Sequence, residues 1–121
     1  MGYNPSEAEL AWLAGLFDGE GCLSIDRPTY DPYTRFRMRI VLQERDGFVL
    51  DHVQRLVGGY RLHRNRQQSW RDNCSEQEEW GVRKRAENLR VARLLLPYLV
   101  LKHEACTDFI VAMESYESRV A

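Results

Sequence analysis

The residues best suited to chemistry form the short run Asp18-Gly19-Glu20-Gly21, at the end of the first expected helix. The Glu20 carboxylate and the Gly19 carbonyl would offer hard oxygen ligands, which suit a divalent ion such as Mg²⁺. A carboxylate at a helix C-terminus meets the negative end of the helix dipole and is unfavourable without a nearby cation. From spacing alone, a solvated acidic turn is the simpler interpretation of this run.

A stripe of small residues runs along the same helix. Ala11, Gly15 and Gly19 recur at every fourth position, and Ala8 lies beside them. Glycine lowers helix stability by about 1 kcal/mol relative to alanine, so two glycines in one helix need a reason. Small side chains allow another backbone to approach closely. That backbone belongs either to a second molecule or to the protein's own sheet, and the pattern alone leaves both open.

Arginines dominate one face of the most regular expected strand, Arg35 to Gln43. Hydrophobic residues alternate with Arg35, Arg37 and Arg39, which predicts an antiparallel strand with one buried and one solvated face. The planar guanidinium group suits bidentate contacts to phosphate and guanine. A solvated strand face is the alternative for any single arginine, but three in alternation favour binding to nucleic acid.

Composition limits the possible classes of protein. The 121 residues allow one domain, and the net charge of -1 argues against an obviously basic nucleic-acid binder. The charge is unevenly distributed, because the basic segment 27–71 contains ten arginines against four acidic residues. The three cysteines and three histidines are widely spaced and match no disulfide framework or metal motif. The longest apolar stretch, 94–101, is too short to span a bilayer, and no signal peptide opens the chain.

The pattern along the chain predicts an α+β domain with a four-stranded antiparallel sheet backed by helices. Ser6 and Glu9 form a capping box for a first helix that ends near Gly19. The remaining expected elements are strands at 22–27 and 35–43, a helix at 48–56, strands at 60–65 and 78–83, and helices at 85–96 and 99–116.

The segment Leu13-Ala14-Gly15-Leu16-Phe17-Asp18-Gly19-Glu20-Gly21 resembles the motif of the LAGLIDADG homing endonucleases, residue against residue. Two further segments look like landmarks of that family, namely 57–60 (Val-Gly-Gly-Tyr) and 96–102 (Leu-Pro-Tyr-Leu-Val-Leu-Lys). The resemblance extends over nearly the whole chain and implies the family's αββαββα core with a saddle-shaped sheet.

The resemblance also implies partners and roles. Members with a single motif are homodimers, so Ala11, Gly15 and Gly19 are expected at an interface between two copies, with Leu13, Leu16 and Phe17 in the protomer core. Glu20 would bind the catalytic metal with the Gly19 carbonyl, the ion being Mg²⁺ or, in its place, Mn²⁺ or Ca²⁺. Lys102 matches a lysine near the active site. Either Gln43 or Asp46 would position the attacking water.

The polar face of the saddle is expected to enter the DNA major groove. In the second hairpin, Arg61 and Arg64 lie on opposite faces by alternation, and we expect Arg64 to face the DNA. The expected DNA-binding residues are Ser24, Asp26, Tyr30, Arg35, Arg37, Arg39, Arg64, Arg66, Glu79 and Arg83.

The leading hypothesis is a metal-dependent, site-specific endonuclease that cuts both strands of a long, nearly palindromic DNA as a homodimer. A non-cutting RNA-splicing maturase or DNA-binding regulator with the same fold is the main alternative, and a plain oligomerisation domain is a third. We expect an intracellular protein, located wherever the host DNA lies, with no membrane contact and no small-molecule substrate.

Overall fold

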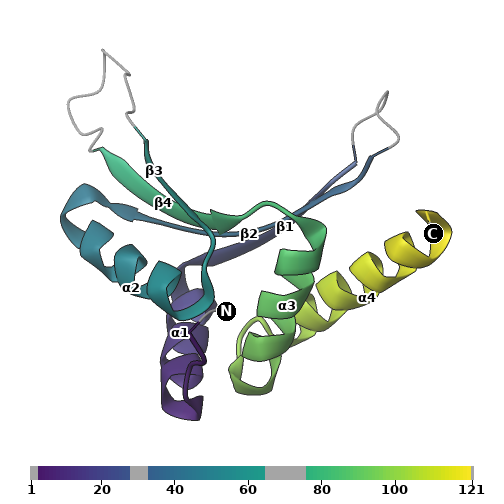
Figure 1. Ribbon diagram of the computed structural model, residues 1–121, viewed down its shortest axis with the longest axis horizontal. Helices are drawn as coiled ribbons and strands as arrows, with labels where there is room; N and C mark the ends of the chain where they lie inside the picture. The colour runs from purple at the N-terminus through teal and green to yellow at the C-terminus, as the bar shows by residue number, and fades with distance from the viewer. Residues whose placement is uncertain (1–2, 28–32, 65–75, 121) are drawn as a thin grey trace.

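The computed structural model describes residues 3–27, 33–64 and 76–120 of the chain, and four helices lie on one side of a curved sheet (Figure 1). The sheet is made of β1 (Gly21–Asp26), β2 (Arg35–Gln43), β3 (Tyr60–Arg64) and β4 (Gln77–Val82). The α-helices are α1 (Glu7–Glu20), α2 (Gly47–Val57), α3 (Arg85–Leu95) and α4 (His103–Val120), with short 3₁₀ helices η1 (Glu44–Asp46) and η2 (Leu96–Tyr98). The predicted α+β class and element order are confirmed.

The four strands pair in the order β1-β2-β4-β3, and every pair is antiparallel. Two hairpins are therefore joined through their inner strands β2 and β4. Because directly paired residues share a face, Met38, its β1 partner Leu23 and its β4 partner Val82 all face the helices. The opposite face is left without a helix and is concave in Figure 1; we call it the open face.

The hydrophobic core fills the space between the sheet and the helices. Leu13 and Phe17 of α1 are fully buried, as predicted, and Leu16 is half-buried against the same core. Trp80 of β4 is also fully buried, and its indole N–H donates to the Gly58 carbonyl at 2.7 Å. Phe36, Met38 and Ile40 of β2 are buried as well, so the apolar face of this strand lies where the sequence predicts.

Both signals at the start of α1 are realised. The Glu9 N–H donates to Ser6 Oγ at 3.2 Å, and the Ser6 N–H donates to Glu9 Oε1 at 2.9 Å, which completes the capping box. The helix continues through Glu20, one residue beyond the expected end, and passes directly into β1 at Gly21. The last motif residues therefore lie at the junction between α1 and the sheet.

A buried amide joins the sheet to α3. Asn88 is fully buried, and its Oδ1 accepts from the Met38 N–H at 2.9 Å. Its Nδ2 donates to the carbonyls of Phe36, Val82 and Lys84 at 3.0, 3.1 and 3.0 Å. The ladder between β2 and β4 ends at the Met38–Val82 pair, so Asn88 binds the β2 backbone groups just where β4 leaves it.

The prediction of a continuous helix over 99–116 is wrong at its start. Leu99 has extended backbone angles, and α4 begins only at His103. The segment between them turns because the Asp18 carboxylate accepts the N–H groups of Val100 and Lys102, at 2.8 and 2.9 Å. Among the described helices, none is both long and apolar enough to cross a membrane.

Candidate active site and nucleic-acid interface

The C-terminal end of α1 is held by the segment that precedes α4. In addition to the two backbone bonds to the Asp18 carboxylate, Lys102 Nζ donates to the Asp18 main-chain carbonyl at 2.6 Å. Burial alone would raise the pKa of the Asp18 carboxyl, but the N–H groups of residues 100–102 hold that pKa below its usual value. The lysine also places a cation at the negative end of the helix dipole.

Glu20 and Gly19 follow directly and are exposed to solvent. The last carbonyls of a helix have no intrahelical donor, so this end of α1 offers a carboxylate and carbonyl oxygens, the hard ligands that Mg²⁺ prefers. Within the described parts of the chain, no group of three His, Cys, Asp or Glu ligands includes Glu20. The donor set fits a divalent ion, but one chain supplies only part of its coordination.

The two candidates for positioning water lie at and beyond the end of β2. Gln43 is the last residue of β2 and is exposed, paired with Gln77 of β4. Asp46 ends η1 and lies 3.6 Å from Arg45 Nε. By strand alternation Gln43 shares the open face with Arg39, whereas Asp46 has already left the sheet. The geometry therefore favours Gln43 over Asp46.

The predicted arginine row lies on the open face, opposite polar residues of β1. Arg35, Arg37 and Arg39 pair directly with Asp26, Ser24 and Cys22. Arg35 and Arg37 are exposed, and Arg39 is half-buried. The face thus presents guanidinium donors beside hydroxyl and carboxylate groups, which are the groups that read base edges and phosphates.

The second hairpin adds Arg64 to this face, as expected. The register places Tyr60 and Arg64 opposite Gly81 and Gln77, on the open side of the sheet. The guanidinium of Arg83 stacks over the Tyr60 ring, 4.2 Å from its centroid. Arg83 is exposed. Tyr30 and Arg66 lie outside the described residues.

Glu79 lies on the predicted face of the sheet, but it is not exposed there as a DNA-binding residue would be. Its side chain is on the open face but is only 6% exposed. It accepts a hydrogen bond from the Tyr60 hydroxyl, and Arg64 Nη1 lies 3.5 Å from its Oε1. Burial and this bond to the carboxylate raise the pKa of Tyr60 to about 12. Glu79 therefore acts within the sheet, holding Tyr60 and Arg64, and is not an exposed reader of bases.

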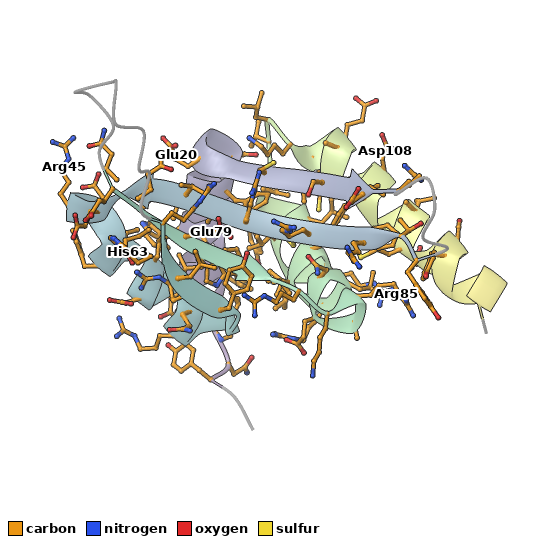
Figure 2. All side chains as sticks on the ribbon, turned by 90° about the horizontal axis from the view of Figure 1, so that it is seen from above. Glu20, Arg45, His63, Glu79, Arg85 and Asp108 are labelled. Carbon is orange, nitrogen blue, oxygen red and sulfur yellow. The ribbon has the colours of Figure 1, made fainter. Side chains whose placement is uncertain are left out.

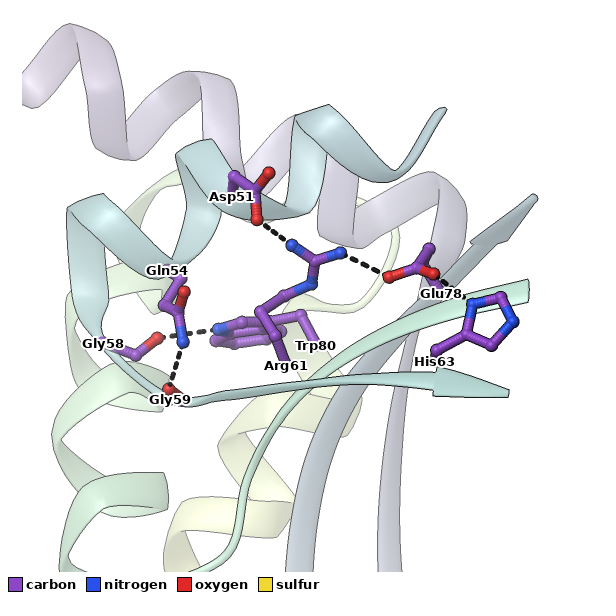
Figure 3. A network of polar contacts seen from close by, with 8 residues as sticks. All are labelled: Asp51, Gln54, Gly58, Gly59, Arg61, His63, Glu78 and Trp80. Carbon is purple, nitrogen blue, oxygen red and sulfur yellow. Dashed lines mark hydrogen bonds and ion pairs between the residues drawn. The ribbon is translucent and has the colours of Figure 1, made fainter. Parts of the chain in front are cut away.

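Arg61 takes the opposite side, where it enters a network of charged residues (Figure 3). It pairs with Asp51 of α2 and, at 2.7 Å, with Glu78 of β4. Glu78 Oε2 lies 2.5 Å from His63 Nδ1. The chain Asp51–Arg61–Glu78–His63 therefore links α2, β3 and β4 on the helix-bearing face.

The small-residue stripe of α1 is open to solvent. Ala8, Ala11, Gly15 and Gly19 are all exposed, and a Cβ built on either glycine would meet no atom within 4 Å. Close packing on the protein's own sheet is therefore not the reason for these glycines. Beside the stripe, Trp12 leaves 42% of its surface exposed and contacts His52 edge-on, with ring centroids 4.9 Å apart.

The sequence patterns include Asp18 and Tyr60 but do not reveal which residues these two side chains hold. Asp18 holds the segment that carries Lys102, and Tyr60 holds Glu79 and supports Arg83. No local signal reveals either role, since the partners of Asp18 lie 82 and 84 residues away. Figure 2, the view from above, shows Glu20 at the end of α1, next to the sheet, and Glu79 on β4.

The fold is similar to those of solved homing endonucleases. I-GzeII in complex with its DNA target matches with a TM-score of 0.78 and 20% identity, covering 98% of this chain and 40% of that one. I-CvuI in complex with the I-CreI target matches with a TM-score of 0.72 and 22% identity, covering 89% of this chain and 67% of that one. I-CeuI complexed with DNA matches with a TM-score of 0.74 and 14% identity, covering 98% of this chain and 59% of that one. This chain thus spans between 40% and 67% of these three proteins.

Among curated proteins, none matches this chain. The model of one protein family, described as LAGLIDADG endonuclease, matches residues 13–82. The matched segment is more than half of the chain and runs from the first motif residue to the end of β4. By this match and by its fold, the chain belongs to the LAGLIDADG endonuclease family.

Proposed function

We propose that this chain is a homing endonuclease that cuts both strands of a long, nearly palindromic DNA as a homodimer. The observation that carries the proposal is the arrangement at the end of α1. Glu20 and Gly19 are exposed there, Lys102 bonds to the same helix end, and the stripe beside them is open. An isologous contact through this stripe would bring two Glu20 side chains together across the two-fold axis.

The donor set supports a requirement for a divalent metal ion. Glu20 and the Gly19 carbonyl would hold Mg²⁺, or Mn²⁺ or Ca²⁺ in its place; the structure of I-CvuI with the I-CreI target was determined with Mg. When bound, such an ion stabilises the charge that develops on the phosphate and lowers the pKa of water. Lys102 adds positive charge near the scissile phosphate, and Gln43 is placed to hold a water molecule. Asp46 is the weaker candidate for that role.

DNA recognition is assigned to the open face. Arg35, Arg37 and Arg39 supply donors along one strand, and Arg64 and Arg83 supply donors along the second hairpin. Ser24 and Asp26 share this face, and Tyr30 and Arg66 remain candidates from sequence alone. Phosphate contacts would give salt-dependent affinity, and base contacts would give specificity. A protein with these targets works inside the cell, where the DNA lies.

The test is selection of cleaved sites from a randomised DNA library with Mg²⁺, followed by assays of Glu20→Gln on the selected site. We expect cleavage by the wild type and a loss of about 100-fold or more in the variant, since several kcal/mol of transition-state stabilisation is removed. Glu104→Gln, at an exposed position of α4, is the matched control and should cleave normally.

Binding of the selected DNA should survive Glu20→Gln, as measured by gel shift in Ca²⁺. Unchanged cleavage in that variant would refute the role of Glu20. If the wild type yields no cleaved site but retains DNA from the same library in the gel shift, a non-cutting maturase or regulator is supported instead.

A further inference from the structure

A second group of metal-ligating side chains lies where β2, β3 and β4 come together at one end of the sheet. Glu44 follows β2, His63 belongs to β3, and Glu76 precedes β4. One ligand atom from each residue lies within 4.8 Å of those of the other two. None of the three belongs to the LAGLIDADG motif or to the open face.

The strand register explains why these side chains converge. Leu42 pairs with Glu78, and the Glu44 N–H donates to the Glu76 carbonyl at 3.0 Å, which continues the pairing two residues further on. The carboxylates of Glu44 and Glu76 are thus directly opposite each other on one face. Like charges in this position repel each other. Such a pair is stabilised by a shared cation.

The imidazole of His63 is oriented as a metal ligand would be. Its Nδ1 lies 2.5 Å from Glu78 Oε2, while Nε2 lies 3.3 Å from Glu76 Oε2. With Nδ1–H donating to the carboxylate, the lone pair of Nε2 is directed at the cluster. A carboxylate behind a histidine is the usual support of a metal-binding imidazole. Arg61 and Asp51 hold Glu78 in turn (Figure 3).

The residue types indicate the class of ion. Imidazole with two carboxylates suits a borderline divalent ion such as Zn²⁺, which accepts nitrogen and oxygen ligands together. Three protein ligands leave at least one position for water. Access is open, because the side chains of His63 and Glu76 are 42% and 43% exposed.

We propose that Glu44, His63 and Glu76 form a binding site for Zn²⁺ or a similar divalent transition ion, separate from Glu20. Glu78 positions the histidine. A bound ion would join the ends of three strands, beside the Gln43–Gln77 pair. The proposal does not rest on nuclease activity.

The test is calorimetry of Zn²⁺ binding to the full chain carrying Glu20→Gln. This substitution excludes binding at the motif carboxylate. We expect one ion per chain in this background. Adding His63→Gln or Glu76→Gln should weaken binding at least about tenfold, and adding Glu78→Gln should weaken it about 10- to 100-fold. His103→Gln is the matched control, because His103 is exposed on α4, and should bind normally.

Circular dichroism of each variant shows whether it has folded, and Glu76→Gln provides the test if His63→Gln does not fold. Absence of saturable binding would overturn the proposal. Equal affinity in the folded Glu76→Gln or His63→Gln variant would do so as well. Loss of binding in Cys22→Ser would also overturn it, by assigning the ion to the exposed thiol.

Discussion

Replacing Asn88 with alanine should strongly destabilise the fold. The substitution removes the amide that pairs with the Met38 N–H and with the carbonyls of Phe36 and Val82. The Lys84 carbonyl still accepts a hydrogen bond from the main-chain N–H of residue 88, at 2.9 Å, so its lost side-chain bond adds little to the cost. Three buried backbone groups are left without a hydrogen-bond partner. Each unsatisfied group costs about 1–2 kcal/mol, which predicts a loss of about 3–6 kcal/mol in the free energy of unfolding.

That loss is a large share of the total stability, which is about 5–15 kcal/mol for a domain. The assay is urea unfolding followed by tryptophan fluorescence and circular dichroism, with a thermal scan. At roughly 4 °C per kcal/mol, the melting temperature should fall by about 12 °C or more. Asn88→Leu has a similar volume but offers no donor or acceptor and should be similarly damaging, which separates lost hydrogen bonds from a cavity.

Gln54→Ala is the matched control. Its exposed amide makes one hydrogen bond, from Nε2 to the Gly59 carbonyl at 3.1 Å, so its loss should cost less than about 1 kcal/mol. If Asn88→Ala lost no more than this control, the argument that the amide replaces missing ladder bonds would be refuted.

Three further predictions concern the helix end, the second hairpin and the exposed stripe. Asp18→Asn should lower the free energy of unfolding by about 1–2 kcal/mol at pH 7. Because the pKa of Asp18 is lower in the folded state, its stabilising contribution is present above the unfolded pKa and is lost as the pH falls through the folded pKa. The urea midpoints of the variant and the wild type should therefore converge in acid. Gly59→Ala should lower the free energy of unfolding, measured in urea, by about 2–4 kcal/mol. The reason is that φ of Gly59 is +97° and the new Cβ would lie 2.5 Å from Trp80 Nε1. A variant as stable as the wild type would contradict this. Gly15→Leu should leave the protomer folded, since its Cβ meets open space, but should weaken self-association at least tenfold in sedimentation equilibrium; an unchanged dimer would place the interface elsewhere.

The sequence by itself determined the order of the helices and strands and one face of the sheet. Alternation in β2 placed Phe36, Met38 and Ile40 in the core and the arginines opposite them. The capping box placed the start of α1, and the motif located Glu20 at its end. These features depend on neighbours within a few residues, so periodicity and local hydrogen bonding are sufficient to predict them.

Only the tertiary structure decided which distant groups meet. Lys102 reaches the end of α1 because Asp18 binds the backbone before α4, and the same contact moves the start of that helix to His103. Glu79 is buried because Tyr60 and Arg64 lie over it on the neighbouring strand. Pairing between separated strands also brings the scattered His63 to two glutamates. Such contacts follow from strand order and register, which are set by packing of the whole core and not by local pattern.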